Sequence, residues 1–280
     1  MRSSIALLIP LILFTATTAE GVVRTLEPAG YDWKAYWAAL TNALARNVVR
    51  LLPLGLAAPM LGFFWEHRLF QIPTWSVWPY VALFVGVEFC YYWFHRISHT
   101  VRWFWASHAV HHAPNDLSFA VAYQLGWTGA VTGATIFYAP LALLGFPPNA
   151  VLGVLALNLL YQFWLHAPWI PKLGPLEWIL NTPSHHRVHH ASNAEYLRGD
   201  GLGANYGGVL IIFDRLFGTC VDERAELPCR YGLVKPLFTY NPLYIAFHEW
   251  IAMARDIGAS RTWRNRFLHV FGPPGGKPSC

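Results

Sequence analysis

Histidine, a common metal ligand, is concentrated in three short stretches of this sequence. The first stretch has the pattern H-x3-H, and the second and third share the pattern H-x2-H-H. The eight histidines of these boxes are His95, His99, His108, His111, His112, His186, His189 and His190. Residues three or four positions apart lie on one face of a helix, so each box brings its rings together. The repeated spacing predicts a metal site built from imidazoles.

Eight histidines are enough ligands for two metal ions, since a catalytic zinc takes three protein ligands and a structural zinc takes four. Without a metal, burying so many rings would remove their favourable solvation by water, and protonating them together would cause electrostatic repulsion between them. We therefore expect a di-metal site. Two more histidines extend the candidate ligand set: His166, which ends an apolar stretch, and His185, which precedes the third box.

The ligand type alone does not identify the metal, because imidazole binds iron, copper, nickel and zinc. The H-E-x-x-H motif of metalloproteases is absent from the sequence. The boxes also contain no carboxylate, in contrast to soluble di-iron bundles with Glu-x-x-His ligands. Attack on an unactivated C–H bond of a lipid needs redox chemistry, which zinc lacks. We therefore favour two iron ions that react with O2.

The composition indicates an integral-membrane protein. Hydrophobic residues make up 55% of the chain and charged residues only 12%, and the 14 Trp and 13 Tyr are typical of a membrane–water boundary. The +5 net charge comes from dispersed cations without a basic run, so no nucleic-acid partner is expected. The four cysteines form no C-x-x-C pair and are expected to be reduced thiols: Cys90, Cys220, Cys229 and Cys280.

Four apolar stretches predict two helical hairpins in the membrane. The first pair covers about 51–65 and 78–94, and the second covers about 127–144 and 151–165. The second pair is separated by Gly145 and two prolines, which cannot continue a helix. Both hairpins begin and end on the same side, so the three boxes lie together at one face of the membrane.

The segments on the side of the boxes hold nearly all the Lys and Arg. The positive-inside tendency therefore places the boxes on the cytoplasmic face. The first 20 residues resemble either a signal peptide or a membrane anchor, and this orientation favours an uncleaved anchor. Residues 31–50 mix aromatic and polar side chains, which predicts a helix in the interface.

The predicted architecture is therefore an all-α integral-membrane protein with two helical hairpins. A helical cap on the cytoplasmic face holds the histidine-ligated di-metal site. We assign residues 1–77 to the membrane anchor and interfacial segments, 78–225 to the catalytic domain and 226–280 to a C-terminal tail.

The order and spacing of the boxes resemble the fatty acid hydroxylase/sterol desaturase superfamily, over about Val87 to Thr219. The stretches L-Y-Q-F-W-L-H at 160–166 and N-T-P-S-H-H-R-V-H-H at 181–190 are most similar to its alkylglycerol monooxygenase-like branch. The resemblance implies that the eight box histidines bind two iron ions that react with O2. It also implies an external reductant, either an electron-transfer protein or tetrahydrobiopterin.

The expected reaction is hydroxylation of a lipid or sterol-like substrate, with desaturation at the same site as the alternative. A membrane metal-binding or transport protein is a hypothesis from another class, and a zinc-dependent hydrolase is a third. Four aromatic residues either line the substrate entrance or anchor the protein in the interface: Trp103, Trp105, Phe119 and Trp127. Five polar residues either orient the histidines or form caps and turns: Asp116, Asn181, Asn193, Asp200 and Asn205.

Overall fold

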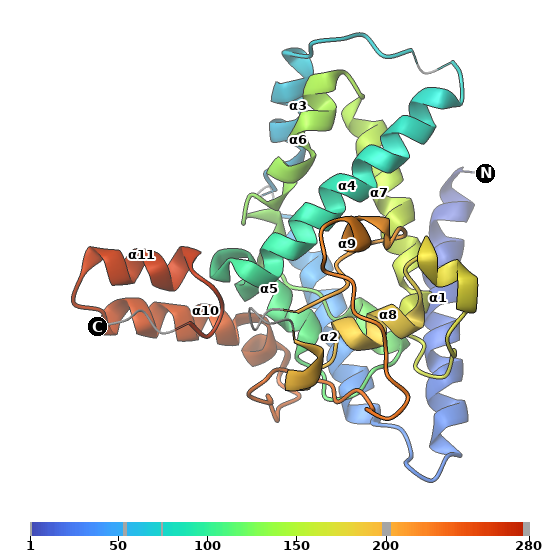
Figure 1. Ribbon diagram of the computed structural model, residues 1–280, viewed down its shortest axis with the longest axis vertical. Coiled ribbons are helices and arrows are strands. Elements are labelled where there is room, and N and C mark those ends of the chain that lie inside the picture. The colour runs from blue at the N-terminus through green and yellow to red at the C-terminus, as the bar shows by residue number, and fades with distance from the viewer. Residues whose placement is uncertain (1, 53–54, 74, 198–202, 277–280) are drawn as a thin grey trace.

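All regular secondary structure in the described part of the chain is helical (Figure 1). The computed structural model describes residues 2–52, 55–73, 75–197 and 203–276. Within these ranges, extended pairing is limited to two isolated bridges, between Leu180 and Leu210 and between Ala191 and Tyr231. The predicted all-α class is therefore confirmed.

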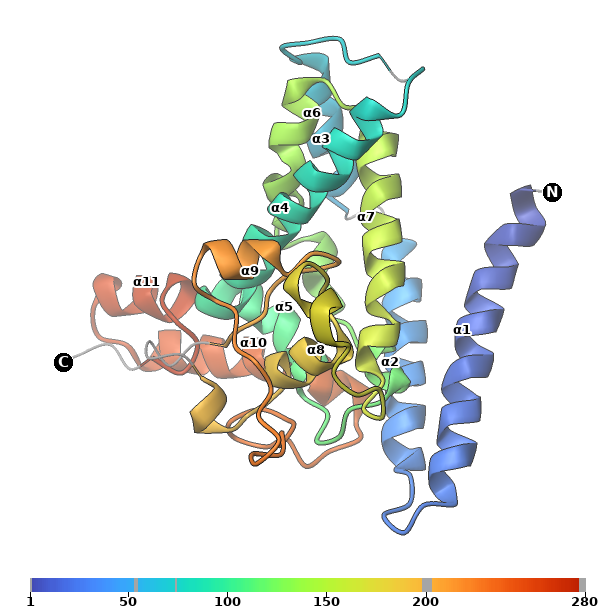
Figure 2. The ribbon, with the colours of Figure 1, turned by 45° about the vertical axis from the view of Figure 1, so that its right-hand side comes forward.

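The first two helices run antiparallel and are joined by a short turn (Figure 2). They are α1 (Arg2–Thr25) and α2 (Trp33–Arg50). Asp32 begins α2 as an N-cap, because its Oδ1 accepts hydrogen bonds from the backbone N–H groups of Lys34 and Ala35, each at 3.0 Å. The predicted interfacial segment 31–50 is thus a helix, as expected from its sequence.

Four further helices pack around one apolar cluster at one end of the molecule (Figure 1). They are α3 (Ala57–Glu66), α4 (Trp78–Thr100), α6 (Ala139–Leu144) and α7 (Pro148–Gln162). The buried side chains between them include Leu61, Leu83, Val87, Leu141 and Val151. This cluster fixes α4, whose far end carries His95 and His99, and α7, which His166 follows in the chain.

The predicted hairpins are only partly present as continuous helices. The stretch 51–65 contains a helix of ten residues, α3, because the chain turns after α2. The stretch 127–144 is not a single helix but contains η2 (Thr128–Ala130), η3 (Ala134–Tyr138) and α6. Gly133 separates η2 from η3 with a φ of 78°, a left-handed conformation that interrupts a right-handed helix.

Two helices in the described residues are long and apolar enough to span a membrane. The apolar windows are Leu8–Thr25 and Pro148–Leu165, and only 17% of each window is buried inside the protein. Large hydrophobic side chains are also exposed near the start of α4, where Trp75 is 86% and Trp78 is 74% exposed. An apolar surface of this kind is typical of contact with lipid.

A second group of helices includes the two that carry the second and third histidine boxes, α5 (Arg102–His112) and α8 (Pro183–His189). The others are α9 (Ile212–Leu216), α10 (Pro242–Ala259) and α11 (Trp263–Phe271). Short 3-10 turns connect them: η1 (Phe119–Tyr123), η4 (Trp164–His166), η5 (Gly174–Trp178) and η6 (Ala194–Tyr196).

The segment predicted as a C-terminal tail holds both α10 and α11. Arg102 attaches α10 to the start of α5, because its Nε lies 2.7 Å from Glu249 Oε1 and its Nη1 lies 2.6 Å from Asp256 Oδ2. The C-terminal helices thus support the helix that carries the second histidine box. The predicted domain limits stay a prediction.

Candidate metal centre

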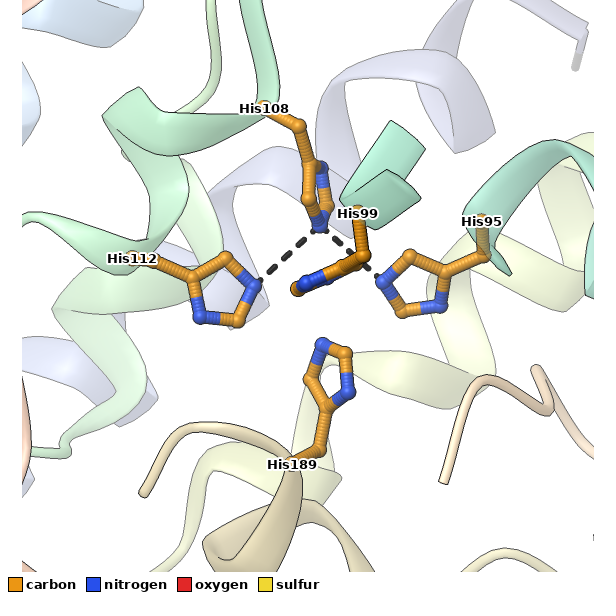
Figure 3. A group of neighbouring side chains, drawn as sticks. All are labelled: His95, His99, His108, His112 and His189. Atoms are coloured by element: carbon orange, nitrogen blue, oxygen red, sulfur yellow. Dashed lines mark hydrogen bonds between the residues drawn. The ribbon is translucent and has the colours of Figure 1, made fainter. Parts of the chain in front are cut away.

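Five histidines from three helices form the first group of candidate ligands (Figure 3). We call it the five-histidine group: His95 and His99 on α4, His108 and His112 on α5, and His189 on α8. Their candidate ligand nitrogens all lie within 4.8 Å of one another. The rings point toward a common centre, which is the arrangement that a bound ion requires.

A second group of four histidines lies beside the first. We call it the four-histidine group: His111 on α5, His166 in η4, and His186 and His190 at α8. All four are buried, and their ligand nitrogens also lie within 4.8 Å of one another. The structure thus brings together nine of the ten predicted ligands, in two groups rather than one.

Histidines that are adjacent in the sequence belong to different groups. His111 belongs to the four-histidine group and His112 to the five-histidine group, and His190 and His189 divide in the same way. Successive residues on a helix point about 100° apart, so one helix serves two adjacent centres. The H-x2-H-H pattern therefore allows one helix to supply histidines to both groups.

The spacing of the nitrogens fits metal coordination. The Nε2 atom of His108 lies 3.0 Å from that of His95 and 3.2 Å from that of His112 (Figure 3). In the four-histidine group, His186 Nε2 lies 3.1 Å from the Nε2 atoms of both His166 and His190. A metal–nitrogen distance of about 2.1 Å places neighbouring ligands roughly 3.0–3.4 Å apart.

Backbone carbonyls fix the orientation of three rings. Nδ1 of His95 donates to the carbonyl of Tyr206 at 2.9 Å, and Nδ1 of His189 donates to that of Ala204 at 2.8 Å. Nδ1 of His166 likewise donates to Gln162 O at 2.9 Å. In a neutral ring the other nitrogen, Nε2, then carries a lone pair that faces the group. A cation at each centre would remove the repulsion between these lone pairs.

Burial keeps the rings in the neutral form that binds metals. It lowers the pKa of His111 to about 4 and that of His189 to about 3. Burial also lowers the pKa of His112, and the adjacent His190 adds to the effect. In addition, the buried Nε2 atoms of His99 and His189 have no hydrogen-bond partner in the described residues. The residues therefore fit two metal ions.

The tenth predicted ligand, His185, lies outside both groups. It forms a separate cluster with Cys220 and Asp222, in which its Nε2 is 3.9 Å from Asp222 Oδ1. Its Nδ1 lies 3.4 Å from the hydroxyl of Thr182. Its predicted role as a metal ligand stays untested, but its ring does not reach the nitrogens of the nine others.

The predicted polar partners contact backbone rather than histidine rings. Asn205 donates from Nδ2 to the carbonyls of His185 and Val221, and its Oδ1 accepts from Val221 N. Asn181 and Asn193 bond to backbone groups in the same way. Asp116 pairs with Arg24 at 3.0 Å. Asp200 and Cys280 lie outside the described residues.

Sequence reasoning missed the loop at 204–206, whose carbonyls hold His189 and His95. Asp214 fixes this loop, because its carboxylate accepts hydrogen bonds from the N–H groups of Tyr206 and Gly207, both at 2.7 Å. Asn205 adopts a left-handed φ of 58°, which its short polar side chain tolerates. The Asn205-Tyr206 pair was visible in the sequence, but backbone carbonyls carry no sequence signal.

An apolar cavity of about 600 Å³ adjoins both groups. His95, His108, His111 and His166 form part of its wall, and the remainder is mainly aliphatic and aromatic. The four aromatic residues proposed for the entrance do not line this cavity. Trp105 instead packs against the rings of His99 and His112, with centroids 5.2 and 5.6 Å apart.

The helical fold and the two histidine groups define a class of protein in which buried imidazoles converge beside an apolar cavity. The chain belongs to the fatty acid hydroxylase family, whose model matches residues 80–219, half of the chain. The family resemblance inferred from the motifs is confirmed. No solved structure matches the chain.

The chain is also similar to several named proteins. Alkylglycerol monooxygenase from Homo sapiens is 43% identical over 77% of the chain and 47% of its own length. An ornithine lipid hydroxylase from Rhizobium tropici is 30% identical over 59% of the chain and 47% of its own length. A cholesterol 25-hydroxylase-like protein from Danio rerio is 27% identical over 69% of the chain and 75% of its own length. The chain thus spans about half of the alkylglycerol monooxygenase that it matches.

Proposed function

We propose that this protein is a membrane-bound non-haem di-iron oxygenase that hydroxylates a lipid. The observation that carries the proposal is the pair of histidine groups, which border one apolar cavity. The names of the relatives support it, since they are monooxygenases and hydroxylases of lipids or sterols.

Each histidine group would hold one iron ion. Imidazole nitrogen is a suitable ligand for iron, and the groups offer five and four rings. When bound, the iron pair would activate O2 with electrons from an external donor and supply the oxidant for a C–H bond. An electron-transfer protein or tetrahydrobiopterin would supply those electrons.

The residues of the chain would position the substrate and exclude water. Phe94 and Leu160 line the cavity and offer an apolar surface for a lipid chain. His108 and His111 also face the cavity, so a bound chain would lie beside both metal positions. Binding in this orientation lowers the entropic cost of bringing one C–H bond to the metals.

We place the protein in the membrane, with the histidine boxes on its cytoplasmic face. The two apolar helices and the exposed Trp75 and Trp78 support membrane insertion. The distribution of Lys and Arg supports the orientation. The first helix, α1, would act as an uncleaved anchor.

Desaturation remains the alternative reaction, because the same ligands and cavity would serve it. The two reactions differ in the mass of the product, since hydroxylation adds an oxygen atom and desaturation removes two hydrogens.

The test uses purified protein in detergent micelles. Metal analysis should find iron in the wild-type protein and less iron in His112→Ala, which lacks a ligand of the five-histidine group. Incubation with lipid extract, O2 and a reductant should give an oxygen-bearing product in the wild type only. Tightly bound zinc with turnover independent of O2 would support a hydrolase. Reversible metal binding without any lipid product would support a metal-binding protein.

A further inference from the structure

Two arginines of α2 line the same cavity as the histidines. Arg46 and Arg50 lie in its wall, which otherwise consists mainly of aliphatic and aromatic side chains. They are four residues apart, so both project from one face of the helix. Two cations of like charge at this spacing destabilise a helix unless an anion offsets them.

The chain provides no such anion among its described residues. No carboxylate in the described ranges forms an ion pair with Arg46 or Arg50. The Nε atom of Arg46 is buried and has no hydrogen-bond partner in the described part of the chain. Burial, and to a smaller extent the charge of Arg50, lowers the pKa of Arg46 to about 10, so the guanidinium stays charged at neutral pH. A buried charged donor without a partner is costly.

One turn earlier on the same face of α2, Asn42 is also without a partner. Its side chain is fully buried, and neither Oδ1 nor Nδ2 has a hydrogen bond in the described residues. This face of α2 therefore holds two side chains, Asn42 and Arg46, with buried polar atoms that no described protein group satisfies, followed one turn later by the exposed Arg50. The arrangement is that of a polar site at the side of an apolar cavity.

We propose that Arg46 and Arg50 bind the phosphate of a lipid substrate whose hydrocarbon chain occupies the cavity beside the histidines. Guanidinium groups form paired hydrogen bonds with phosphate oxygens, and a phosphate has enough oxygens to bind two of them. A neutral glycerol headgroup would leave both charges unpaired. This inference rests on the proposed function, because it names the substrate class of the same cavity.

The proposed phosphate site and the histidines share one cavity. Arg46, Arg50, His95 and His108 belong to the wall of one cavity. A lipid held by its phosphate would therefore keep its chain in the cavity that borders both metal positions. The aliphatic wall contributed by α1 and α7, including Leu13 and Leu157, would contact the chain.

Binding to the purified full-length protein, measured by native mass spectrometry in detergent micelles, tests the proposal without turnover. The probes are hexadecylglycerol phosphate, neutral hexadecylglycerol and palmitate. Wild-type protein should prefer the phosphate lipid to both others. Arg46→Gln and Arg50→Gln should each weaken its binding about ten- to a hundredfold, as expected for loss of one charged partner. Neither change should weaken hexadecylglycerol binding.

The matched control is Arg264→Gln, an exposed arginine on α11 that does not line the cavity. It should bind all three probes like the wild type. Equal loss in the control, or equal affinity for palmitate and the phosphate lipid, would overturn the proposal. Glycerol phosphate without a chain should compete only weakly, and competition equal to that of the lipid would assign the site to a free phosphate ester instead.

Failure of this inference is distinguishable from failure of the proposed function. If the protein contains iron and oxidises hexadecylglycerol as well as its phosphate, the function stands and the phosphate site does not. If the protein lacks iron and forms no oxygenated product from any lipid, the proposed function fails, whatever the binding experiment gives.

Discussion

The Nε2 atoms of His166 and His186 lie 3.1 Å apart, although His166 belongs to none of the three histidine boxes. Its Nδ1 is bound to the carbonyl of Gln162, so its Nε2 faces the four-histidine group. The η4 turn that follows α7 therefore supplies a histidine that completes a group otherwise formed by α5 and α8. An apolar helix suited to the membrane is thereby connected directly to the metal centre.

Substitution of His166 by alanine should empty the four-histidine group and leave the other group intact. Only three rings would remain at that centre, against five at its neighbour. Iron content should fall from about two to about one ion per chain, because metal affinity depends on the number of ligands. Metal analysis of the purified variant measures this. Exposed His67→Ala is the control, and unchanged iron in His166→Ala would remove His166 from the ligand set.

Substitution of Asn205 by glycine should weaken metal binding without removing any ligand. Glycine keeps the left-handed backbone conformation but loses the bonds to His185 and Val221. The loop that orients His189 and His95 would become less rigid. Loss of such a supporting contact typically lowers metal affinity by roughly ten- to a hundredfold. Competition with a chelator measures the affinity. Asn193→Ala, which affects a loop without contact to either ring, should retain wild-type affinity.

The metal-free protein should lose stability in mild acid. Burial lowers the pKa values of His111 and His189 from 6.5 to about 4 and about 3. The unfolded chain therefore binds more protons than the folded chain below about pH 6.5, so stability rises with pH there. The contribution is complete above pH 6.5 and decreases as the pH falls toward 4 and then 3. Melting temperatures across this range should fall steadily with pH, and a constant value would contradict the buried neutral state.

Substitution of Glu88 by alanine should destabilise the fold. Its Oε2 accepts hydrogen bonds from the N–H groups of Val209 and Leu210, and its Oε1 accepts one from Asn158 at 2.5 Å. Removing the carboxylate leaves three donors in a buried region, at a cost of about 2–5 kcal/mol. Thermal unfolding of the metal-free variant measures the loss. Exposed Glu66→Ala should unfold like the wild type, and an equal effect in both would contradict the role of Glu88.

The sequence predicted most of the residues in the two histidine groups because their spacing follows the helical repeat. His95 and His99 lie one turn apart, and the two H-x2-H-H boxes repeat one geometry. The sequence did not reveal that His111 and His112 serve different groups, since that depends on how α5 lies against α8 and η4. Local spacing identifies which rings share a face but not which neighbours complete each group.

The ends of helices were harder to predict in apolar stretches that small residues interrupt. The stretch 127–144 has the hydropathy of a membrane helix, yet Gly133 and the neighbouring 3-10 turns interrupt it. The segment 226–280 lacks a long apolar run, so α10 and α11 were missed. Their stability comes from contacts such as that of Arg102 with Glu249, which periodicity within one segment does not show.

The division of adjacent histidines between the two groups has a consequence for any metal ions that the groups bind. His111 with His112, and His189 with His190, connect the two centres through single peptide units. Covalent geometry therefore limits how far the ions can separate, even when surrounding helices shift with temperature or membrane thickness. The centres of the two histidine groups should therefore keep nearly the same separation in membranes of different thickness.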